Sequence, residues 1–367
     1  MKKKALLIGC GSEIGSNLIL QACENNFDFE IDTVLNQPIE NDNTFPKLNQ
    51  AHSIQARLEL AFPLEFGRIK VLSEDKISID KKIIKLIFSN LQDYLESKEK
   101  KYWDVIILAT SKDHLNDSHL LEKLKRLGKY IFGMAESSVM TNLYPTLLNF
   151  DSKLLNVKNI SKQDRLFSLG SCQTNGWLSQ FKVVLNILEN INKLSIERVE
   201  VDIVHPETPT GMIGTKSYSP RKQDSRNNLR PSFSQIEKAM KKLLPNVSSL
   251  HTVSLRIPIE EPGYQITRTY FKGQLDKNFI DTFENNIEKF SNNYKDVNYT
   301  NIPLGSKAYK YRKAIANILP APYLQLNNNC FSTDEEIHQI ITQAYVSNVH
   351  AYCYHSLLAI KYILNKM

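Results

Sequence analysis

Residues 5–20 read ALLIGCGSEIGSNLIL, an apolar run that ends in glycines and is followed by apolar residues at helical spacing. The pattern predicts a strand, a tight turn and a helix. The segment EIDTVLN, at 30–36, predicts the next strand, so the chain opens with a β-α-β unit of a parallel sheet. Gly9, Gly11 and Gly15 occupy the turn, where glycines let a ligand approach the backbone closely.

The glycine turn is a candidate dinucleotide site. A pyrophosphate at such a turn meets backbone amides and the positive dipole end of the following helix. The spacing G-x-G-x-x-x-G is one residue longer than the usual fingerprint, and a plain strand-to-helix turn is the alternative. In NAD-binding proteins an acidic residue at the end of the second strand binds the ribose hydroxyls, but here that strand end carries Asn36 and Gln37. Neutral amides do not repel the 2′-phosphate of NADP, so the cofactor could be NAD or NADP. The candidate cofactor contacts here are Gly9, Gly11, Ile14, Gly15, Asn36, Gln37 and Thr110.

Further helices and strands are predicted along the first half of the chain. We expect a hairpin around Asp80, an amphipathic helix over 90–103, a buried parallel strand over 104–110, a helix over 118–128 closed by Gly128, and a strand over 129–133. After about residue 170 the pattern changes. We expect a helix over 176–190, long alternating strands of an antiparallel sheet at 195–205, 251–259 and 263–273, and a C-terminal helix over 348–367.

These two patterns predict two domains, because 367 residues with 42% apolar side chains exceed the size of one ordinary core. The expected fold class is α/β. A Rossmann-type domain with a parallel sheet would comprise residues 1–170 plus the C-terminal helix 346–367. An α+β catalytic domain with a mostly antiparallel sheet would comprise residues 171–345.

Composition narrows the class of protein. The net charge of +7 is spread over lysines interleaved with acidic residues, which argues against a nucleic-acid partner. The five cysteines form no C-x-x-C pair, so we expect no metal site and a reducing compartment. No stretch approaches the roughly 18 apolar residues that span a bilayer. We therefore expect a soluble cytoplasmic protein with no membrane partner.

Cys172 lies in SLGSCQTNG, at 168–176, where the predicted helix begins. The first turn of a helix favours a thiolate over a thiol, which suits a nucleophile. A small buried side chain is the alternative for any single cysteine. His205 ends a predicted strand and opens a long polar loop, where its side chain could reach a cleft as a base.

Four segments together resemble the glyceraldehyde-3-phosphate dehydrogenase family. SLGSCQTNGWL, at 168–178, is similar to its Ser-Asn-Ala-Ser-Cys-Thr-Thr-Asn, and HPETPTG, at 205–211, to its His-x-x-Thr-x-Thr-Gln. Residues 229–258 resemble its Pro-Thr-Ser-Thr-Gly segment and the Phe-Arg-Val-Pro that follows. Residues 345–363 resemble its Trp-Tyr-Asp-Asn-Glu and the next helix. Together with the glycine turn at Gly9, these matches occur in the family's order from Gly9 to Ile363, over nearly the whole chain.

The resemblance implies an enzyme that oxidises a phosphorylated or acidic small aldehyde with NAD or NADP. Cys172 would be the nucleophile, His205 the base, and Asn348 a contact of the nicotinamide. A thiohemiacetal would become a thioester, released by phosphorolysis or hydrolysis. The implied substrate and phosphate contacts are Ser171, Thr174, Thr208, Thr210, Ser234 and Arg256. The family also implies a homotetramer.

The chain departs from the family at Gln173 and Gln235, which replace residues of its inorganic phosphate site. We expect these glutamines to crowd that pocket, which puts phosphorolysis in question. Two alternatives therefore stay open. One is an acyl-phosphate reductase of the semialdehyde dehydrogenase type, and the other is a paralogue kept for binding or regulation.

Overall fold

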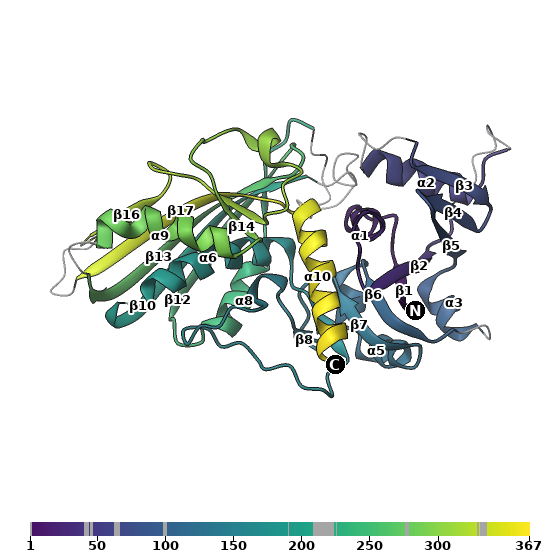
Figure 1. Cartoon of the computed structure of the whole chain (residues 1–367), viewed down its shortest axis with the longest axis horizontal. Helices are drawn as coiled ribbons and strands as arrows, with labels where there is room; N and C mark the ends of the chain where they lie inside the picture. The colour runs from purple at the N-terminus through teal and green to yellow at the C-terminus, as the bar shows by residue number, and fades with distance from the viewer. Residues whose placement is uncertain are drawn as a thin grey trace. The chain divides into compact units, whose positions relative to one another are not determined.

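The computed structural model describes residues 2–39, 44, 47–61, 67–97, 101–189, 191–207, 224, 226–275, 279–328, 330 and 336–367. These residues form two compact units (Figure 1). The first comprises Met1–Pro145, Asn159–Gly170 and Cys353–Met367, and the second comprises Thr146–Lys158 and Ser171–Tyr352. One unit has a largely parallel sheet and the other a mostly antiparallel sheet, so the chain is a mixed α/β protein.

The first unit contains a nine-stranded sheet in the order β3-β4-β5-β2-β1-β6-β7-β9-β8. Its strands are β1 (Lys3–Ile8), β2 (Phe29–Asn36), β3 (Ile69–Ser73), β4 (Lys76–Ile79), β5 (Lys82–Phe88), β6 (Trp103–Leu108), β7 (Gly128–Gly133), β8 (Thr141–Asn142) and β9 (Leu166–Ser168). Its helices are α1 (Glu13–Glu24), α2 (Gln50–Ala61), α3 (Leu91–Glu96), α4 (Lys112–Asn116) and α5 (Ser118–Lys125). Helices separate β1 from β2 and β6 from β7, whereas β3, β4 and β5 follow one another without a helix between them.

The central strands of this sheet are buried because their apolar runs are continuous. Residues 5–8 of β1 and 105–108 of β6 are all buried, which is typical of parallel strands that are covered on both faces. β1 pairs in parallel with β2 and β6, which confirms the parallel β-α-β opening. β4 and β5 pair antiparallel around Asp80, whose φ is +54°, so the predicted hairpin is confirmed.

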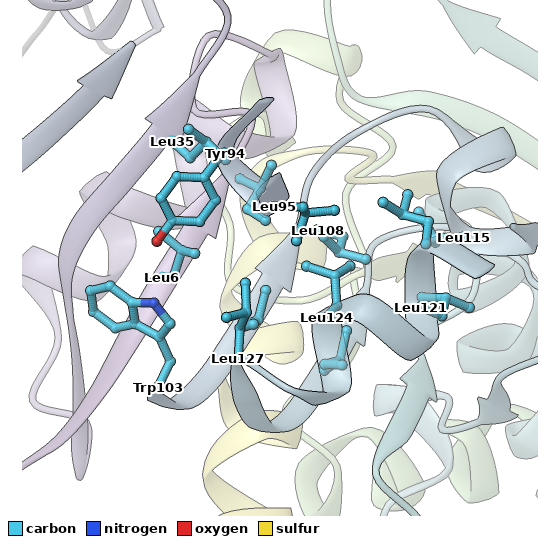
Figure 2. Packing of buried hydrophobic residues seen from close by; sticks show 14 of the residues in the cluster. Leu6, Leu35, Tyr94, Leu95, Trp103, Leu108, Leu115, Leu121, Leu124 and Leu127 are labelled. Carbon is cyan, nitrogen blue, oxygen red and sulfur yellow. The ribbon is translucent and has the colours of Figure 1, made fainter. Parts of the chain in front are cut away.

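One core cluster of this unit packs leucines of β1, β6 and α5 together. Figure 2 shows Leu6, Leu108 and Leu124 among the side chains of this cluster. Trp103 is 2% exposed and belongs to the same cluster. Burial of these side chains from water fixes α5 against the sheet.

The second unit contains an eight-stranded sheet in the order β11-β12-β10-β13-β17-β15-β14, with β16 paired to β17. Its strands are β10 (Asn192–Pro206), β11 (Arg230–Ser232), β12 (Ser249–Ile257), β13 (Gly263–Gln274), β14 (Val297–Tyr299), β15 (Ala316–Ile318), β16 (Gln325–Asn327) and β17 (Ile337–Val346). Its helices are α6 (Cys172–Leu188), α8 (Ile236–Leu243) and α9 (Phe279–Asn293), with short 3₁₀ turns η2 (Pro145–Leu147) and η4 (Ser306–Tyr309). The final helix, α10 (His350–Lys366), begins in this unit and continues in the first.

One face of this second sheet is buried under helices. Alternate residues are buried along β13 and β17, as expected for a sheet with one covered face. The helix α6 lies on this face: a Cβ on its Gly176 would lie 2.3 Å from Val346 Cγ1 of β17. Its Gln180 amide also donates to Gln265 Oε1 of β13 at 3.1 Å. Figure 1 shows α6 and α9 running along this sheet.

Three predictions about elements are wrong. The helix expected over 90–103 ends at Glu96, and Trp103 begins β6, because its indole is buried in the core beside the sheet. Gly128 begins β7 and does not close α5, which ends at Lys125. β10 and β12 pair in parallel, because the intervening chain, which includes β11 and α8, returns to the same end of the sheet.

Candidate active site

The glycine turn lies at the carboxyl ends of β1 and its two neighbouring strands. Gly9 N donates to Leu35 O at 2.9 Å, and Ala109 N donates to Ile8 O at 2.9 Å. The Ser12 hydroxyl lies 2.8 Å from Gly9 O and 3.1 Å from Ala109 O. The order of the strands reverses between β1 and β6, and ligands of open parallel sheets bind at such a point, outside the carboxyl ends of the strands.

Two glycines are required by the geometry of this turn. Gly9 has a φ of +94°, and a Cβ there would lie 2.6 Å from Ala109 O. A Cβ on Gly15 would lie 2.1 Å from Gly9 O. Ser12 caps α1, since its Oγ accepts from Gly15 N at 3.0 Å. The close approach of helix and turn therefore depends on the absence of side chains.

Three polar side chains surround the turn. Asn36 Oδ1 accepts from Gly11 N at 3.2 Å, and Arg57 Nε of α2 donates to Gly11 O at 2.9 Å. The Thr110 hydroxyl is buried and has no hydrogen-bond partner among the residues that the structure describes. A buried hydroxyl without a partner calls for a ligand or water. This hydroxyl and the glycine cradle fit a dinucleotide pyrophosphate.

The other two predicted cofactor contacts of this unit lie close to the turn in sequence. Ile14 is the second residue of α1, and its carbonyl accepts from Cys353 Sγ at 3.5 Å. Gln37 follows the last residue of β2, and its side chain is exposed. An exposed amide at this strand end is available to a ligand.

Cys172 is the first residue of α6, four residues before the predicted start of that helix. Ser171 is the N-cap: its Oγ accepts from Thr174 N at 3.1 Å, and the two hydroxyl oxygens lie 2.8 Å apart. Cys172 is partly exposed. The helix dipole favours a thiolate at this position. Ser171 and Thr174 are thus committed to the cap, and anion binding by them stays a prediction.

The amide of Asn348 links Cys172 to the sheet. Its Nδ2 lies 3.7 Å from Cys172 Sγ as a donor, and its Oδ1 accepts from Gly263 N at 2.9 Å. Because Oδ1 is bound to a backbone donor, Nδ2 faces the sulfur. A Cβ on Gly263 would lie 2.8 Å from Asn348 Oδ1, Pro206 Cδ and Val204 O. Position 263 therefore requires glycine, because any side chain there would collide with β10 and with the Asn348 amide.

Glu261 positions the segment that carries Asn348. Its carboxylate accepts from Val349 N at 2.7 Å, from His350 N at 3.1 Å and from Ser347 Oγ at 3.2 Å. A carboxylate at the start of a helix satisfies backbone donors and interacts favourably with the helix dipole. Glu261 thereby fixes the residues on both sides of Asn348.

The residue after the cysteine is also fixed by β13. Gln265 Nε2 donates to Gln173 O at 3.0 Å and to Gln173 Oε1. Gln173 is 5% exposed, so its side chain packs between α6 and the sheet. The residues from Glu261 to Gln265 thus position both neighbours of the sulfur, Asn348 on one side and Gln173 on the other.

His205 lies near the end of β10 on the face that α6 covers. Side chains alternate along a strand, so His205 shares a face with Ile203, whose register partner Gln265 contacts α6. The His205 Nδ1 atom lies 2.6 Å from Pro206 O. Since a carbonyl only accepts, Nδ1 carries hydrogen, and Nε2 of the neutral ring is an acceptor. This tautomer suits a general base.

The remaining predicted substrate contacts fall into three groups. Arg256 is 2% exposed and is the register partner of His205 on β12. The hydroxyl of Ser234 accepts from Ile236 N at 3.1 Å at the start of α8. Thr208 and Thr210 lie outside the described residues. The structure therefore brings Arg256 beside His205.

The other cysteines lie in surroundings that disfavour a thiolate. Burial raises the pKa of Cys10 to about 12 and that of Cys23 to about 11. Burial also raises the pKa of Cys330, and Cys353 is buried within α10. Reactivity follows the thiolate, so these positions are poor nucleophiles.

Sequence reasoning missed several residues of this site. It named no role for Glu207, Arg230, Glu261, Gly263 and Gln265. Glu207 follows His205 by two positions, and EEPGYQ, at 260–265, places an acid and a glycine at the start of a predicted strand. Strand pairing and an ion pair place Arg230 and Glu207 near His205, and long-range hydrogen bonds place the other three near Asn348 and Gln173. No local sequence pattern contains these contacts.

In comparisons with known proteins, no family model and no curated protein matches the chain. Among the residues that the structure describes, no helix is long and apolar enough to cross a membrane. Over the same residues, no group of three or more His, Cys, Asp or Glu side chains is arranged to hold a metal ion. The family resemblance thus depends on the sequence motifs alone.

Proposed function

We propose that the chain is an NAD(P)-dependent aldehyde dehydrogenase that forms a thioester on Cys172. One observation carries the proposal: the Asn348 amide donor lies 3.7 Å from a cysteine sulfur at the start of a helix. The same sheet face carries His205, whose Nε2 is an acceptor. A nucleophile, a donor that stabilises it and a base together support covalent chemistry at a carbonyl carbon.

The glycine turn of the first unit supports a nicotinamide dinucleotide as the cofactor. Gly9, Gly11 and Gly15 would admit its pyrophosphate to the backbone, and the Thr110 hydroxyl and Asn36 would add polar contacts. Arg57, held against the turn by Gly11 O, would add positive charge near these phosphates. When bound, the dinucleotide supplies a hydride acceptor.

The reaction at Cys172 follows from the groups around its sulfur. His205 Nε2 first takes the proton of the Cys172 thiol, and the thiolate adds to the aldehyde carbon, so a C–S bond forms and the carbonyl π bond breaks. The resulting oxyanion takes that proton back from His205 and becomes the hydroxyl of a thiohemiacetal. Asn348 Nδ2 stabilises the negative charge on the sulfur before this addition. His205 Nε2 then takes the hydroxyl proton while the C–H bond breaks and its hydride leaves for the bound dinucleotide, so the carbon is oxidised to a thioester. Water or phosphate then attacks the acyl carbon, and the C–S bond breaks to restore the thiolate.

Absorbance of the reduced nicotinamide tests the proposal. The purified chain is mixed with NAD or NADP and with glyceraldehyde 3-phosphate, erythrose 4-phosphate or uncharged aldehydes. We expect at least one aldehyde to be oxidised. Cys172→Ser should lower turnover by at least about 10³-fold, because a hydroxyl is a far weaker nucleophile.

The matched control is Cys330→Ser, a change of the same chemistry at a partly buried cysteine outside the candidate site. This variant should keep normal turnover. If no aldehyde is oxidised and no acyl phosphate is reduced in the reverse direction, both the aldehyde dehydrogenase and the acyl-phosphate reductase are excluded. Normal turnover in Cys172→Ser would exclude the covalent mechanism alone.

A further inference from the structure

Two buried arginines and one buried glutamate form a cluster beside His205. The side chains of Arg230, Arg256 and Glu207 are each at most 3% exposed. Charged side chains are rarely buried this deeply unless they are paired, because removing a charge from water is costly. Burial lowers the pKa of Arg230 from its ordinary value.

The single carboxylate contacts both guanidinium groups. Glu207 Oε2 forms an ion pair with Arg230 Nη2, and Glu207 Oε1 lies 3.5 Å from Arg256 Nη1. Arg256 Nη1 also donates to Pro206 O at 3.2 Å. The same carbonyl accepts from His205 Nδ1. One backbone oxygen thus connects the arginine cluster to the candidate base.

The strand register places the cluster in a row with His205. Arg230 of β11 is the partner of Arg256 of β12, and Arg256 is the partner of His205 of β10. Directly paired residues of neighbouring strands present their side chains on the same face, about 5 Å apart. The two guanidinium groups therefore lie one and two strands away from the candidate base.

We propose that Glu207 is a resident anion that fills the anion site formed by Arg230 and Arg256. A phosphate that entered this site would lie against a buried carboxylate, and two anions in a buried site repel each other. Arg256 is the position that the sequence resemblance assigns to a substrate phosphate. If the proposed dehydrogenase activity is correct, on which this consequence rests, the substrate presents an uncharged group at this position. Substrates with a phosphate there are poor.

Anion binding tests the inference without any turnover. Thermal unfolding is followed by fluorescence of Trp177, the tryptophan of the second unit, in a Trp103→Phe background. Phosphate is compared with chloride at equal ionic strength. The wild-type cluster should show no phosphate-specific stabilisation. Glu207→Gln should lower the melting temperature in chloride, and about 50 mM phosphate should raise it again by about 5 °C if binding is millimolar.

Asp296→Asn is the matched control, because it removes the carboxylate of another buried ion pair of this unit, Lys182 with Asp296 at 2.6 Å. Its melting temperature should fall, and phosphate should not raise it again. Arg256→Met in the Glu207→Gln background should abolish the recovery. Recovery that persists in this double variant, or none in a folded Glu207→Gln protein, would overturn the inference.

If Glu207→Gln does not fold, phosphate-dependent melting of the wild-type protein still tests the inference. Phosphate-specific stabilisation of the wild-type chain that Arg256→Met removes would show that an external anion enters the site despite Glu207, and would overturn the inference. Its absence would support a site that is already filled. Since neither measurement uses an aldehyde or a dinucleotide, their outcomes are separate from those of the proposed activity.

Discussion

The glycine turn of the first unit and the cysteine site of the second are built in opposite ways. The turn is made of backbone: Gly9, Gly11 and Gly15 shape it, and the Ser12 hydroxyl closes it. The cysteine site is made of side chains, in which Asn348 contacts Cys172 across 176 positions of sequence. A backbone site is sensitive to added volume, whereas a side-chain site is sensitive to lost hydrogen bonds.

The two sites share one feature, a glycine at which a Cβ would collide. In the turn this is Gly15, which lies against Gly9 O, and in the cysteine site it is Gly263, which lies against Asn348 Oδ1. Alanine at either position should therefore damage one site and spare the other.

Gly15→Ala should have the largest effect on dinucleotide affinity. A Cβ would lie 2.1 Å from Gly9 O and 2.8 Å from Cys10 Cα, so the turn must move. Overpacking of about 3 kcal/mol would weaken dinucleotide binding by about 100-fold. Isothermal titration calorimetry measures this change. The alkylation rate of Cys172 with iodoacetamide should stay unchanged, and a fall in that rate would contradict the separation of the two sites.

Gly263→Ala should have the complementary effect. Its Cβ meets three atoms at 2.8 Å, so Asn348 must move away from Cys172. We expect turnover to fall by about 30-fold and alkylation of Cys172 by at most about tenfold, as for loss of the Asn348 donor. Dinucleotide affinity should fall far less than in Gly15→Ala, because the glycine turn is unchanged. The control is Gly305→Ala, whose Cβ would meet nothing within 4 Å among the described residues. Equal effects of the two substitutions would contradict a specific role for Gly263.

Acidification should destabilise the second unit through His350. Burial, aided by the charge of Lys313, lowers the pKa of His350 from 6.5 to about 4. The unfolded chain binds the proton more tightly, so this contribution is complete above pH 6.5 and is lost as pH falls toward 4. Between pH 7 and 5 the free energy of unfolding should fall by about 2 kcal/mol from this residue.

Urea unfolding of the second unit, followed by Trp177 fluorescence at each pH in the Trp103→Phe background, measures this dependence. His350→Gln should flatten it, because the titrating group is gone. His251→Gln, at an exposed position of β12, is the control and should keep the wild-type dependence. An unchanged slope in His350→Gln would show that another group causes it.

Asn348→Leu should have a smaller effect than the preceding substitutions, and this effect is on the pH at which Cys172 becomes reactive. Leucine keeps the branched shape of the side chain but removes the donor 3.7 Å from Cys172 Sγ, together with the Oδ1 atom that accepts from Gly263 N. A hydrogen bond to a charged group contributes about 1.5 kcal/mol, so the midpoint pH of alkylation should rise by about one unit. Alkylation rates between pH 5 and 10 measure this midpoint. An unchanged midpoint would mean that the amide does not stabilise the thiolate.

Gln37→Asp should have the smallest effect, on cofactor preference. An aspartate at the end of β2 would bind two ribose hydroxyls and repel a 2′-phosphate. The ratio of affinities for NAD and NADP should shift toward NAD by about fivefold, or about 1 kcal/mol. Calorimetry with each dinucleotide measures the ratio. An unchanged ratio would place the ribose elsewhere.

The first unit could be predicted from sequence more fully than the second. The strand, turn and helix at 5–20 lie within one short segment, so local periodicity and glycine spacing indicate all three. The helix expected over 90–103 shows where this reasoning fails. Helical spacing continues through the segment, yet burial of Trp103 in the core requires a strand there.

In the second unit, the cysteine and its helix were visible in the sequence, but their surroundings were not. Local pattern predicts the helix, although its observed start at Cys172 lies four residues before the predicted one. The roles of Glu261 and Gly263 follow only from pairing between distant strands, which no local pattern contains. The position of Gln173 is a similar case: the sequence suggests that it crowds an anion pocket, whereas Gln265 binds it at the sheet.

Mass spectrometry of an acid-quenched reaction tests the central claim most directly. The protein, NAD or NADP and an aldehyde substrate are mixed, quenched within the first turnover and digested. We predict that the peptide containing Cys172 gains the mass of the aldehyde less two hydrogens, as a thioester requires. In Gly15→Ala this adduct should be scarce unless the dinucleotide is saturating. Oxidation of the aldehyde with no adduct on Cys172, or with the adduct on another cysteine, would contradict the account.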